Sequence, residues 1–179
     1  MNYTTNQLIL LMLKKGDLMP EELIKKYFSK PQFINKKYPI FEYECEDEGC
    51  KLNGNFDRYI ILNGDNISRL SGLNEKSVDR IIFLKKAQDM KVDVILCELT
   101  LGEKKYTTVV EKIKKSGEYI LTILEELGFR IRDFKCIFIG KYKNPKRVIE
   151  KPFSIPKFHR NDIIIKKLSC GDNFPEIRQ

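Results

Sequence analysis

The amino-acid sequence predicts a mixed α/β domain built around one sheet. Three segments rich in Ile, Val and Phe follow one another closely, which is typical of consecutive strands. A long segment with apolar residues at helical spacing comes next, and a fourth apolar strand segment follows it. A helix between two strands must bury its apolar face against the sheet that they form, so this order indicates a layered α/β architecture.

Length and composition agree with one folded unit. The 179 residues suit a single domain, and 42% of them are hydrophobic, which is enough for a buried core. We divide the chain into an N-terminal helical segment (1–40), a core (56–140) and a basic C-terminal extension (141–179). The longest aliphatic run is six residues against the roughly 18 of a membrane-spanning helix, and no signal-peptide cleavage site follows it. We therefore expect a cytoplasmic protein that does not enter a membrane.

The N-terminal segment is expected to add a helical layer. Thr4 or Thr5 can cap a first helix that Gly16 ends, and Pro20 suits the first turn of a second helix. Two short helices can also open a winged helix-turn-helix. However, prolines interrupt residues 31–39, where the recognition helix of that motif would have to follow.

Three strands are predicted at Phe56–Leu62, Val78–Leu84 and Val92–Leu101. Turn-forming residues at 63–66 separate the first two strands, and polar residues at 85–91 separate the second from the third. The short separations indicate that the three strands are neighbours in one sheet.

A long helix is predicted at Glu103–Leu127, with Gly128 placed to end it. Its apolar stripe includes Val109, Ile113, Ile120 and Leu124. Gly117 lies within this stripe, where the missing side chain would allow a sheet to approach the helix closely. Further strands are expected at Phe134–Ile139 and Ile163–Leu168.

The cysteine pattern predicts reduced thiols. Five cysteines form an odd set with irregular spacing, whereas a secreted disulfide framework usually has an even number. A zinc site is the alternative, but only Cys45 and Cys50 are close together and the single histidine, His159, is distant. The acidic stretch Glu42–Glu48, which contains Cys45, could be a metal-attracting edge, but we expect it to be a solvated loop.

Two carboxylates interrupt the apolar strands, Asp79 at the start of the second and Glu98 inside the third. A charged group at such a position is costly to bury unless it is paired or binds a cation. Adjacent strands could bring both carboxylates to one metal ion, and side-chain alternation places Thr100 on the same face as Glu98. The alternative is that both acids make surface salt bridges, for Asp79 with the neighbouring Arg80.

At these residues the chain resembles the PD-(D/E)xK nuclease-like superfamily. The resemblance rests on VDRIIF (78–83), on VILCELT (94–100) and on the order of elements, and it spans Phe56 to Gly140. It implies a restriction-endonuclease-like core of a helix, three strands, a helix and a strand. It also implies that Asp79 and Glu98 bind magnesium or manganese, and that a lysine two residues after the Glu positions or activates the attacking water. That position holds Thr100, so the lysine of the motif is missing here.

A lysine from the following helix could replace the missing one, as in other members of the superfamily. Matching residues 109–113 to the helix pattern assigns this role to Lys112. Lys114 lies, like Lys112, on a flank of the apolar stripe, and Lys104 and Lys105 follow Glu98 closely, so these three are alternatives. The catalytic residues that we expect are Asp79, Glu98, Lys112 and Thr100.

The net charge of +8 favours an acidic partner, and the charge is concentrated toward the C-terminus. Residues 130–167 hold twelve Lys or Arg against three Asp or Glu, with Phe and Tyr interleaved. Such a mixture suits a phosphate backbone and unstacked bases, although a solvated lysine-rich surface would have the same composition. The nucleic-acid-binding residues that we expect are Lys141, Tyr142, Lys143, Lys146, Arg147 and Phe158.

The sequence therefore predicts a nuclease that uses Mg²⁺ or Mn²⁺ to hydrolyse the phosphodiester backbone of nucleic acid. The alternative is a nuclease fold without catalysis that acts as a nucleic-acid-binding or assembly module, which Thr100 favours. The two carboxylates inside apolar strands favour the active enzyme. DNA and RNA are both open as partners, and the oligomeric state is open between a monomer and a homodimer.

Overall fold

The computed structural model describes residues 41–42, 44–55, 59–70, 77–85, 90–144, 151–156 and 158–174. The helices expected within residues 1–40 lie outside these ranges, as do Lys146 and Arg147. No helix in the described ranges is long and apolar enough to cross a bilayer.

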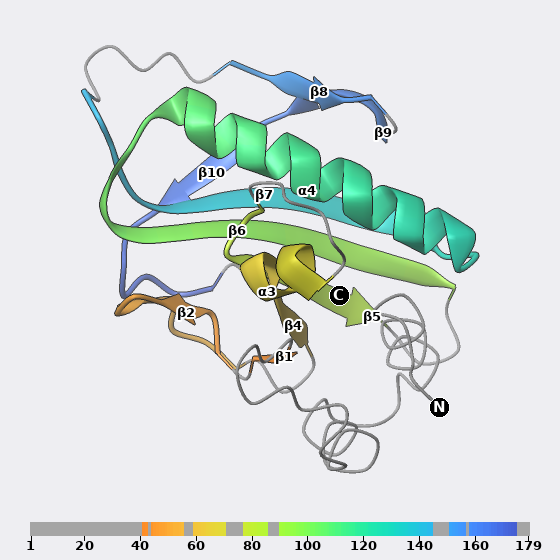
Figure 1. Ribbon diagram of the computed structural model, residues 1–179, viewed down its shortest axis with the longest axis horizontal. Helices are drawn as coiled ribbons and strands as arrows, with labels where there is room; N and C mark the ends of the chain where they lie inside the picture. The colour runs from red at the N-terminus through yellow and green to blue at the C-terminus, as the bar shows by residue number, and fades with distance from the viewer. Residues whose placement is uncertain are drawn as a thin grey trace.

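A six-stranded mixed sheet forms the centre of the fold (Figure 1). Its strands, in spatial order, are β1 (Phe41–Glu42), β4 (Ile60–Asn63), β5 (Arg80–Lys85), β6 (Lys91–Lys104), β7 (Arg130–Tyr142) and β10 (Ile165–Leu168). Strands β1, β4, β5 and β6 pair antiparallel, whereas β6, β7 and β10 pair parallel. A parallel pair needs a crossover connection, and between β6 and β7 this is helix α4 (Tyr106–Glu126). The mixed α/β class is confirmed, and three strands, a helix and a strand follow in the predicted order.

Helix α4 packs on one face of the sheet through the stripe predicted for it. Its buried residues Val109, Ile113, Ile120 and Leu124 share an apolar core with the strands. Gly128 follows the helix with a φ of 76°, and the amide of Phe129 donates to the Leu124 carbonyl at 2.8 Å. A glycine in this left-handed conformation is a common helix end, so the predicted stop is confirmed.

A two-stranded pair, β8 (Phe153–Ile155) and β9 (Phe158–Ile163), lies over the outer side of α4 (Figure 1). Gly117 permits this contact, because a Cβ at that position would lie 2.5 Å from Ile155 Cδ1. The close approach expected at Gly117 is therefore observed, but the nearest neighbour is β8 and not the central sheet.

The opposite face of the central sheet carries a second apolar cluster. The short hairpin of β2 (Glu46–Asp47) and β3 (Cys50–Lys51) lies on this side. Leu52 and Phe174 pack there with Ile95 and other sheet residues. Both faces of the sheet are thus covered, which explains why its central strands read as nearly continuous apolar runs.

Helix α3 (Gly64–Leu70) replaces the turn that was expected after the first strand. Asn63 caps it, because its Oδ1 accepts the amide of Asn66 at 2.9 Å. The first helical residue must be glycine, since a Cβ there would lie 1.9 Å from the Val78 carbonyl oxygen. A helix this short shows little periodicity in the sequence, so only its Gly and Asn residues were visible, and they indicated a turn.

Cys50 and Cys170 form a disulfide, so the expectation of reduced thiols is wrong for this pair. The other three cysteines, Cys45, Cys97 and Cys136, are free and buried, as expected. The zinc alternative is also wrong, because the Cys50 sulfur is bonded to Cys170. The two partners are 120 residues apart in the sequence, so spacing gave no sign of the bond.

Candidate functional site

Asp79 lies just before β5, and both its backbone and its carboxylate are held in place. Its carbonyl oxygen accepts hydrogen bonds from the Gly64 amide at 3.1 Å and from the Arg80 guanidinium at 2.8 Å. Its Oδ2 accepts the amide of Leu99 at 2.6 Å, and only 6% of the side chain is exposed. The carboxylate is therefore fixed toward β6.

Glu98 lies on β6 beside Asp79. Arg80 pairs with Cys97 in the antiparallel β5–β6 ladder. Asp79, which precedes Arg80, therefore comes opposite Glu98, which follows Cys97. Glu98 is two residues after Leu96, so it lies on the same side of β6, the side that faces α4. None of its side chain is exposed. A carboxylate buried in this way needs positive partners.

The first of these partners is Lys112 on helix α4. Its Nζ lies 2.7 Å from Glu98 Oε1 and 3.4 Å from Asp79 Oδ1. Because both carboxylates contact one nitrogen, they are close enough for a single ion to bridge, well inside a limit of about 10 Å. The geometry thus matches the expectation that Lys112 approaches the pair from the helix.

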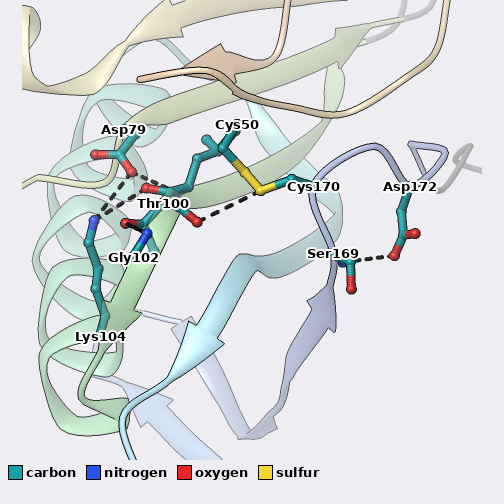
Figure 2. The surroundings of a disulfide bond; sticks show 9 residues. Cys50, Asp79, Thr100, Gly102, Lys104, Ser169, Cys170 and Asp172 are labelled. Carbon is teal, nitrogen blue, oxygen red and sulfur yellow. Dashed lines mark hydrogen bonds and ion pairs between the residues drawn. A yellow bond between two sulfur atoms is a disulfide. The ribbon is translucent and has the colours of Figure 1, made fainter.

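The second partner is Lys104 at the end of β6. Its Nζ lies 2.5 Å from Glu98 Oε1, 3.3 Å from the Leu99 carbonyl oxygen and 3.8 Å from Asp79 Oδ2. It lies six positions after Glu98, an even offset, so both face the same side, and Gly102 places no side chain between them. Figure 2 shows Lys104 reaching toward Asp79 from this strand.

The other two lysines considered from the sequence point elsewhere. Lys114 Nζ lies 5.7 Å from the centre of the Phe153 ring, and Lys105 is exposed where α4 begins. Lys104 remained only an alternative because the strand was expected to end at Leu101. Continuing the alternation to residue 104 would have placed it on the face of Glu98.

Thr100 shapes the end of β6. Its Oγ1 accepts the amide of Gly102 at 3.1 Å, and the β6–β7 register is irregular just after Leu99. Gly140 on β7 leaves room for it, because a Cβ there would lie 2.7 Å from the Thr100 methyl group. Irregularities of this kind redirect side chains at sheet edges. This one precedes Lys104 on β6.

The disulfide lies beside Thr100, as Figure 2 shows. Cys170 Sγ lies 3.8 Å from the Thr100 carbonyl oxygen. Its bond to Cys50 is supported by backbone contacts, since the Asn53 amide donates to the Asp172 carbonyl at 2.9 Å. The disulfide thus holds the C-terminal segment after β10 close to Thr100 on β6.

Two carboxylates and two ammonium groups thus meet in one buried cluster. Burial raises the pKa of Glu98 and the neighbouring Asp79 raises it further, whereas Lys112 and Lys104 oppose the shift. Burial alone would lower the pKa of Lys112, but Glu98 and Asp79 outweigh burial, so this pKa is raised. Lys112 therefore keeps its proton, and the formal charges of the cluster balance.

Arg80 is not the partner of the Asp79 carboxylate, so the surface salt bridge considered for Asp79 is wrong. Its guanidinium lies 3.4 Å from Asp47 Oδ1 and 3.9 Å from Glu42 Oε1, and it also donates to the Glu46 carbonyl. These contacts with Arg80 hold the acidic stretch against the sheet, where its β2 strand forms a short hairpin with β3. The expectation of a solvated loop is thereby corrected.

The nucleic-acid-binding residues expected on β7 differ in exposure. Lys141 and Lys143 are exposed, but Tyr142 is buried, and its ring stacks on Phe138 with centroids 4.5 Å apart. The expectation that Tyr142 stacks on a base is corrected, because an aromatic residue in a basic segment can equally be core. The Phe158 side chain lies outside the described part of the chain.

Two further basic residues of this segment are engaged within the protein. Arg132 makes a bidentate pair with the buried Asp93 at 2.7 and 2.5 Å, and Lys135 lies 3.3 Å from Asp133. The basic excess counted from the sequence is therefore larger than the charge available to a partner. The exposed lysines on β10 and at the end of β7 are Lys141, Lys143, Lys166 and Lys167.

The donor atoms around Asp79 and Glu98 fit a hard divalent cation. They are carboxylate oxygens together with the Leu99 carbonyl, and Mg²⁺ commonly uses one or two carboxylates with water completing its shell. Glu98 Oε2 is buried and has no hydrogen-bond partner among the described residues. Within the same residues, no group of three or more His, Cys, Asp or Glu could hold a metal by itself.

Comparison of the chain with known proteins does not assign it to a family. No family model matches the sequence, and no match is found among curated proteins or solved structures.

Proposed function

We propose that this protein is a metal-dependent nuclease that hydrolyses the phosphodiester backbone of DNA or RNA. The observation that carries the proposal is the position of Lys112, whose Nζ contacts both Glu98 and Asp79. A helix lysine supplies the positive charge that Thr100 cannot, next to two carboxylates that can hold a cation.

The topology supports the same proposal. A restriction-endonuclease-like core has a helix, three strands, a helix and a strand. Strands β4, β5 and β6, helix α4 and strand β7 agree with the part of that order after the first helix, with the short helix α3 inserted between β4 and β5. Glu98 lies on β6 and Asp79 lies immediately before the adjacent strand β5, and the PD-(D/E)xK resemblance expects its metal-binding acids at these positions.

In this proposal Asp79, Glu98 and the Leu99 carbonyl hold Mg²⁺ or Mn²⁺. When bound, the cation supplies Lewis acidity, which lowers the pKa of a coordinated water and offsets charge on the scissile phosphate. Leu99 orients the Asp79 carboxylate through its amide. The Lys112 ammonium can donate to a phosphate oxygen, and its partial burial strengthens that interaction relative to bulk water.

Cleavage assays on plasmid, single-stranded DNA and RNA, each with Mg²⁺ and Mn²⁺, test the proposal. We expect metal-dependent cleavage of at least one substrate, and a fall of about a hundredfold or more for Glu98→Gln. Glu103→Gln is the matched control, because Glu103 is an exposed carboxylate on the same strand and should cleave at the wild-type rate. Absence of cleavage on every substrate with either metal contradicts the proposal.

One observation favours the second candidate, a nuclease fold without catalysis that binds nucleic acid. Both carboxylates already have ammonium partners, so the cluster is neutral without a metal ion. Salt-dependent binding of nucleic acid, with no cleavage and no effect of Glu98→Gln on affinity, would identify this function. A concentration series in analytical ultracentrifugation distinguishes a monomer from a homodimer under either function.

A cytoplasmic location belongs to this proposal, and the Cys50–Cys170 disulfide provides its test. Thiols in the cytoplasm are normally kept reduced, whereas the structure has this pair oxidised. Trapping thiols by alkylation in intact cells, followed by mass spectrometry, reports the state of Cys50. A fully oxidised pair in cells contradicts an ordinary reducing cytoplasm.

A further inference from the structure

We propose that Lys104 occupies the cation position of this site and must leave before a divalent metal ion binds. The inference rests on the proposed metal site, but it concerns a residue that neither the motif nor the helix pattern assigns. Lys104 would then set metal affinity by competition, whereas Lys112 would remain in place beside the bound ion.

The oxygens around Lys104 carry the argument. Its Nζ contacts Glu98 Oε1, the Leu99 carbonyl oxygen and Asp79 Oδ2, at 2.5, 3.3 and 3.8 Å. These are one oxygen from each residue that would hold the metal ion. Lys112 contacts the two carboxylates but not the Leu99 carbonyl oxygen. Of these two lysines, only Lys104 contacts all three residues that would hold the metal ion.

Lys104 is also the more exposed of the two lysines. Its side chain is 27% exposed, against 15% for Lys112, which projects from a well-packed helix. It extends from the end of β6, beyond the irregularity that follows Leu99, and Gly102 presents no side chain in its way. The ammonium group can therefore move to solvent without unpacking the core.

Charge balance explains why one lysine should leave. The two carboxylates and two ammonium groups sum to zero, so a divalent ion would add two uncompensated positive charges to a buried cluster. Buried charges without partners are strongly unfavourable. Release of Lys104 lowers that excess by one charge and frees the three oxygens. Glu98 Oε2, which has no partner among the described residues, can take up the cation as Lys104 departs.

Calorimetric titration with Mn²⁺ alone tests this competition without any substrate. Lys104→Met keeps the apolar stem and removes the ammonium group, so we expect it to tighten Mn²⁺ binding by about tenfold or more. Lys105→Met is the matched control for an exposed neighbouring lysine and should bind as wild type does. Lys112→Met removes the same charge but frees no carbonyl, so its gain should be smaller than that of Lys104→Met.

Thermal unfolding gives a second readout. Without metal, the Lys104→Met variant leaves two carboxylates to share one ammonium group, so its Tm should fall below that of wild type. Saturating Mn²⁺ should then raise its Tm by more than it raises that of wild type, because ligand binding to the folded state adds stability. If Lys104→Met does not fold, Lys104→Gln, with a neutral polar side chain, replaces it in both measurements.

The outcomes separate this inference from the proposed function. Tighter Mn²⁺ binding by Lys104→Met upholds the inference, even if no nucleic acid is cleaved and the nuclease proposal fails. Affinity equal to or weaker than wild type, or a gain for Lys112→Met as large as for Lys104→Met, overturns the inference while Glu98-dependent cleavage can stand. Absence of Mn²⁺ binding by wild type and all variants overturns both.

Discussion

At the scale of single residues, the site divides one role among several side chains. Thr100 occupies the position where the resembling superfamily carries lysine, and its hydroxyl accepts the Gly102 amide at 3.1 Å. Its contribution is to the path of the strand, and the positive charge comes instead from Lys112 and Lys104. The proposed site can therefore hold a positive charge beside its two carboxylates although residue 100 is not a lysine.

Lys112→Ala tests the helix lysine directly. We expect cleavage to fall by about a hundredfold or more, since a positioned donor at a developing charge is often worth that much. Mn²⁺ binding and folding should persist. Lys115→Ala, on the same helix and 37% exposed, is the matched control. Initial cleavage rates under saturating Mn²⁺ make the comparison, and equal rates for Lys112→Ala and wild type would remove Lys112 from the mechanism.

Sequence alone predicted that Asp79 and Glu98 lie close together, because charged residues within apolar strands are unusual, and in the structure both contact Lys112. It left Lys104 among several alternatives, since the third strand was expected to end at Leu101, whereas β6 continues to Lys104. It misassigned Tyr142 because composition carries no information on which face an aromatic ring takes. Contacts between strands decide both points, and they involve residues distant in sequence.

At the scale of elements, the β6–β7 pair determines how the site is built. The two strands run in register from Asp93 to Leu99 and again from Glu103, with an interruption between these two stretches. Gly140 lies opposite this interruption with a φ of 144°, a conformation that side chains rarely adopt. The close contact of Gly140 with Thr100 therefore permits the path that β6 takes between Leu99 and Glu103.

Gly140→Ala should destabilise the protein and disturb the site together. A Cβ there would lie 2.7 Å from both the methyl group and the carbonyl oxygen of Thr100, so strain and overpacking add to about 2–4 kcal/mol. Gly128→Ala is the matched control, because its φ is 76° but nothing lies within 4 Å, so only about 1 kcal/mol of strain is expected. Urea denaturation measures both, and equal losses would contradict the packing role of Gly140.

The long elements were predictable and the short ones were not. Helix α4 and the central strands have enough residues to show their periodicity, and their boundaries were wrong by only a few positions. The seven residues of α3 and the two-residue strands of the hairpin are too short to show any. Their conformations depend on contacts such as the one between Asn63 and Asn66, which resemble turn signals in sequence.

At the scale of the whole molecule, the disulfide joins distant parts of the chain beside the site. It links β3 to the segment after β10, and its two cysteines are 120 positions apart in the sequence. The same segment carries Phe174, which packs on the face of the sheet opposite α4. Long-range closure of this kind cannot be read from spacing, and it constrains the unfolded chain more than the folded one.

Cys170→Ser should lower the free energy of unfolding by about 2–5 kcal/mol under non-reducing conditions. A dithiol reductant should bring wild type to the stability of the variant, because both then lack the same cross-link. Denaturant unfolding with and without reductant measures the effect. Cys136→Ser is a control for a buried free thiol, and its loss should be unchanged by reductant. A reductant effect of equal size in wild type and Cys170→Ser would show that the cross-link does not form in solution.

The exposed lysines at the β7–β10 edge predict how the whole molecule meets nucleic acid. Lys141 and Lys143 lie at the end of β7 beside the end of β6, and the neighbouring edge strand β10 carries Lys166 and Lys167. If these four charges each neutralise a phosphate, the slope of log K against log salt should be about −3 to −4. Lys141→Ala with Lys143→Ala should weaken binding for all sequences alike and reduce the slope by about one to two.

The control for this pair is Lys91→Ala with Arg130→Ala, because both residues are exposed and pair with each other at the opposite end of the β6–β7 ladder. Removing the same net charge there should lower affinity slightly through the long-range field but leave the slope nearly unchanged, since no phosphate contact is lost. Fluorescence anisotropy with a labelled oligonucleotide, repeated over a series of salt concentrations, gives affinity and slope together. If both double variants change the slope equally, the attraction belongs to the net charge of the protein and not to the β7–β10 edge. If neither changes it, the four lysines form a solvated surface, and nucleic acid must contact the protein elsewhere.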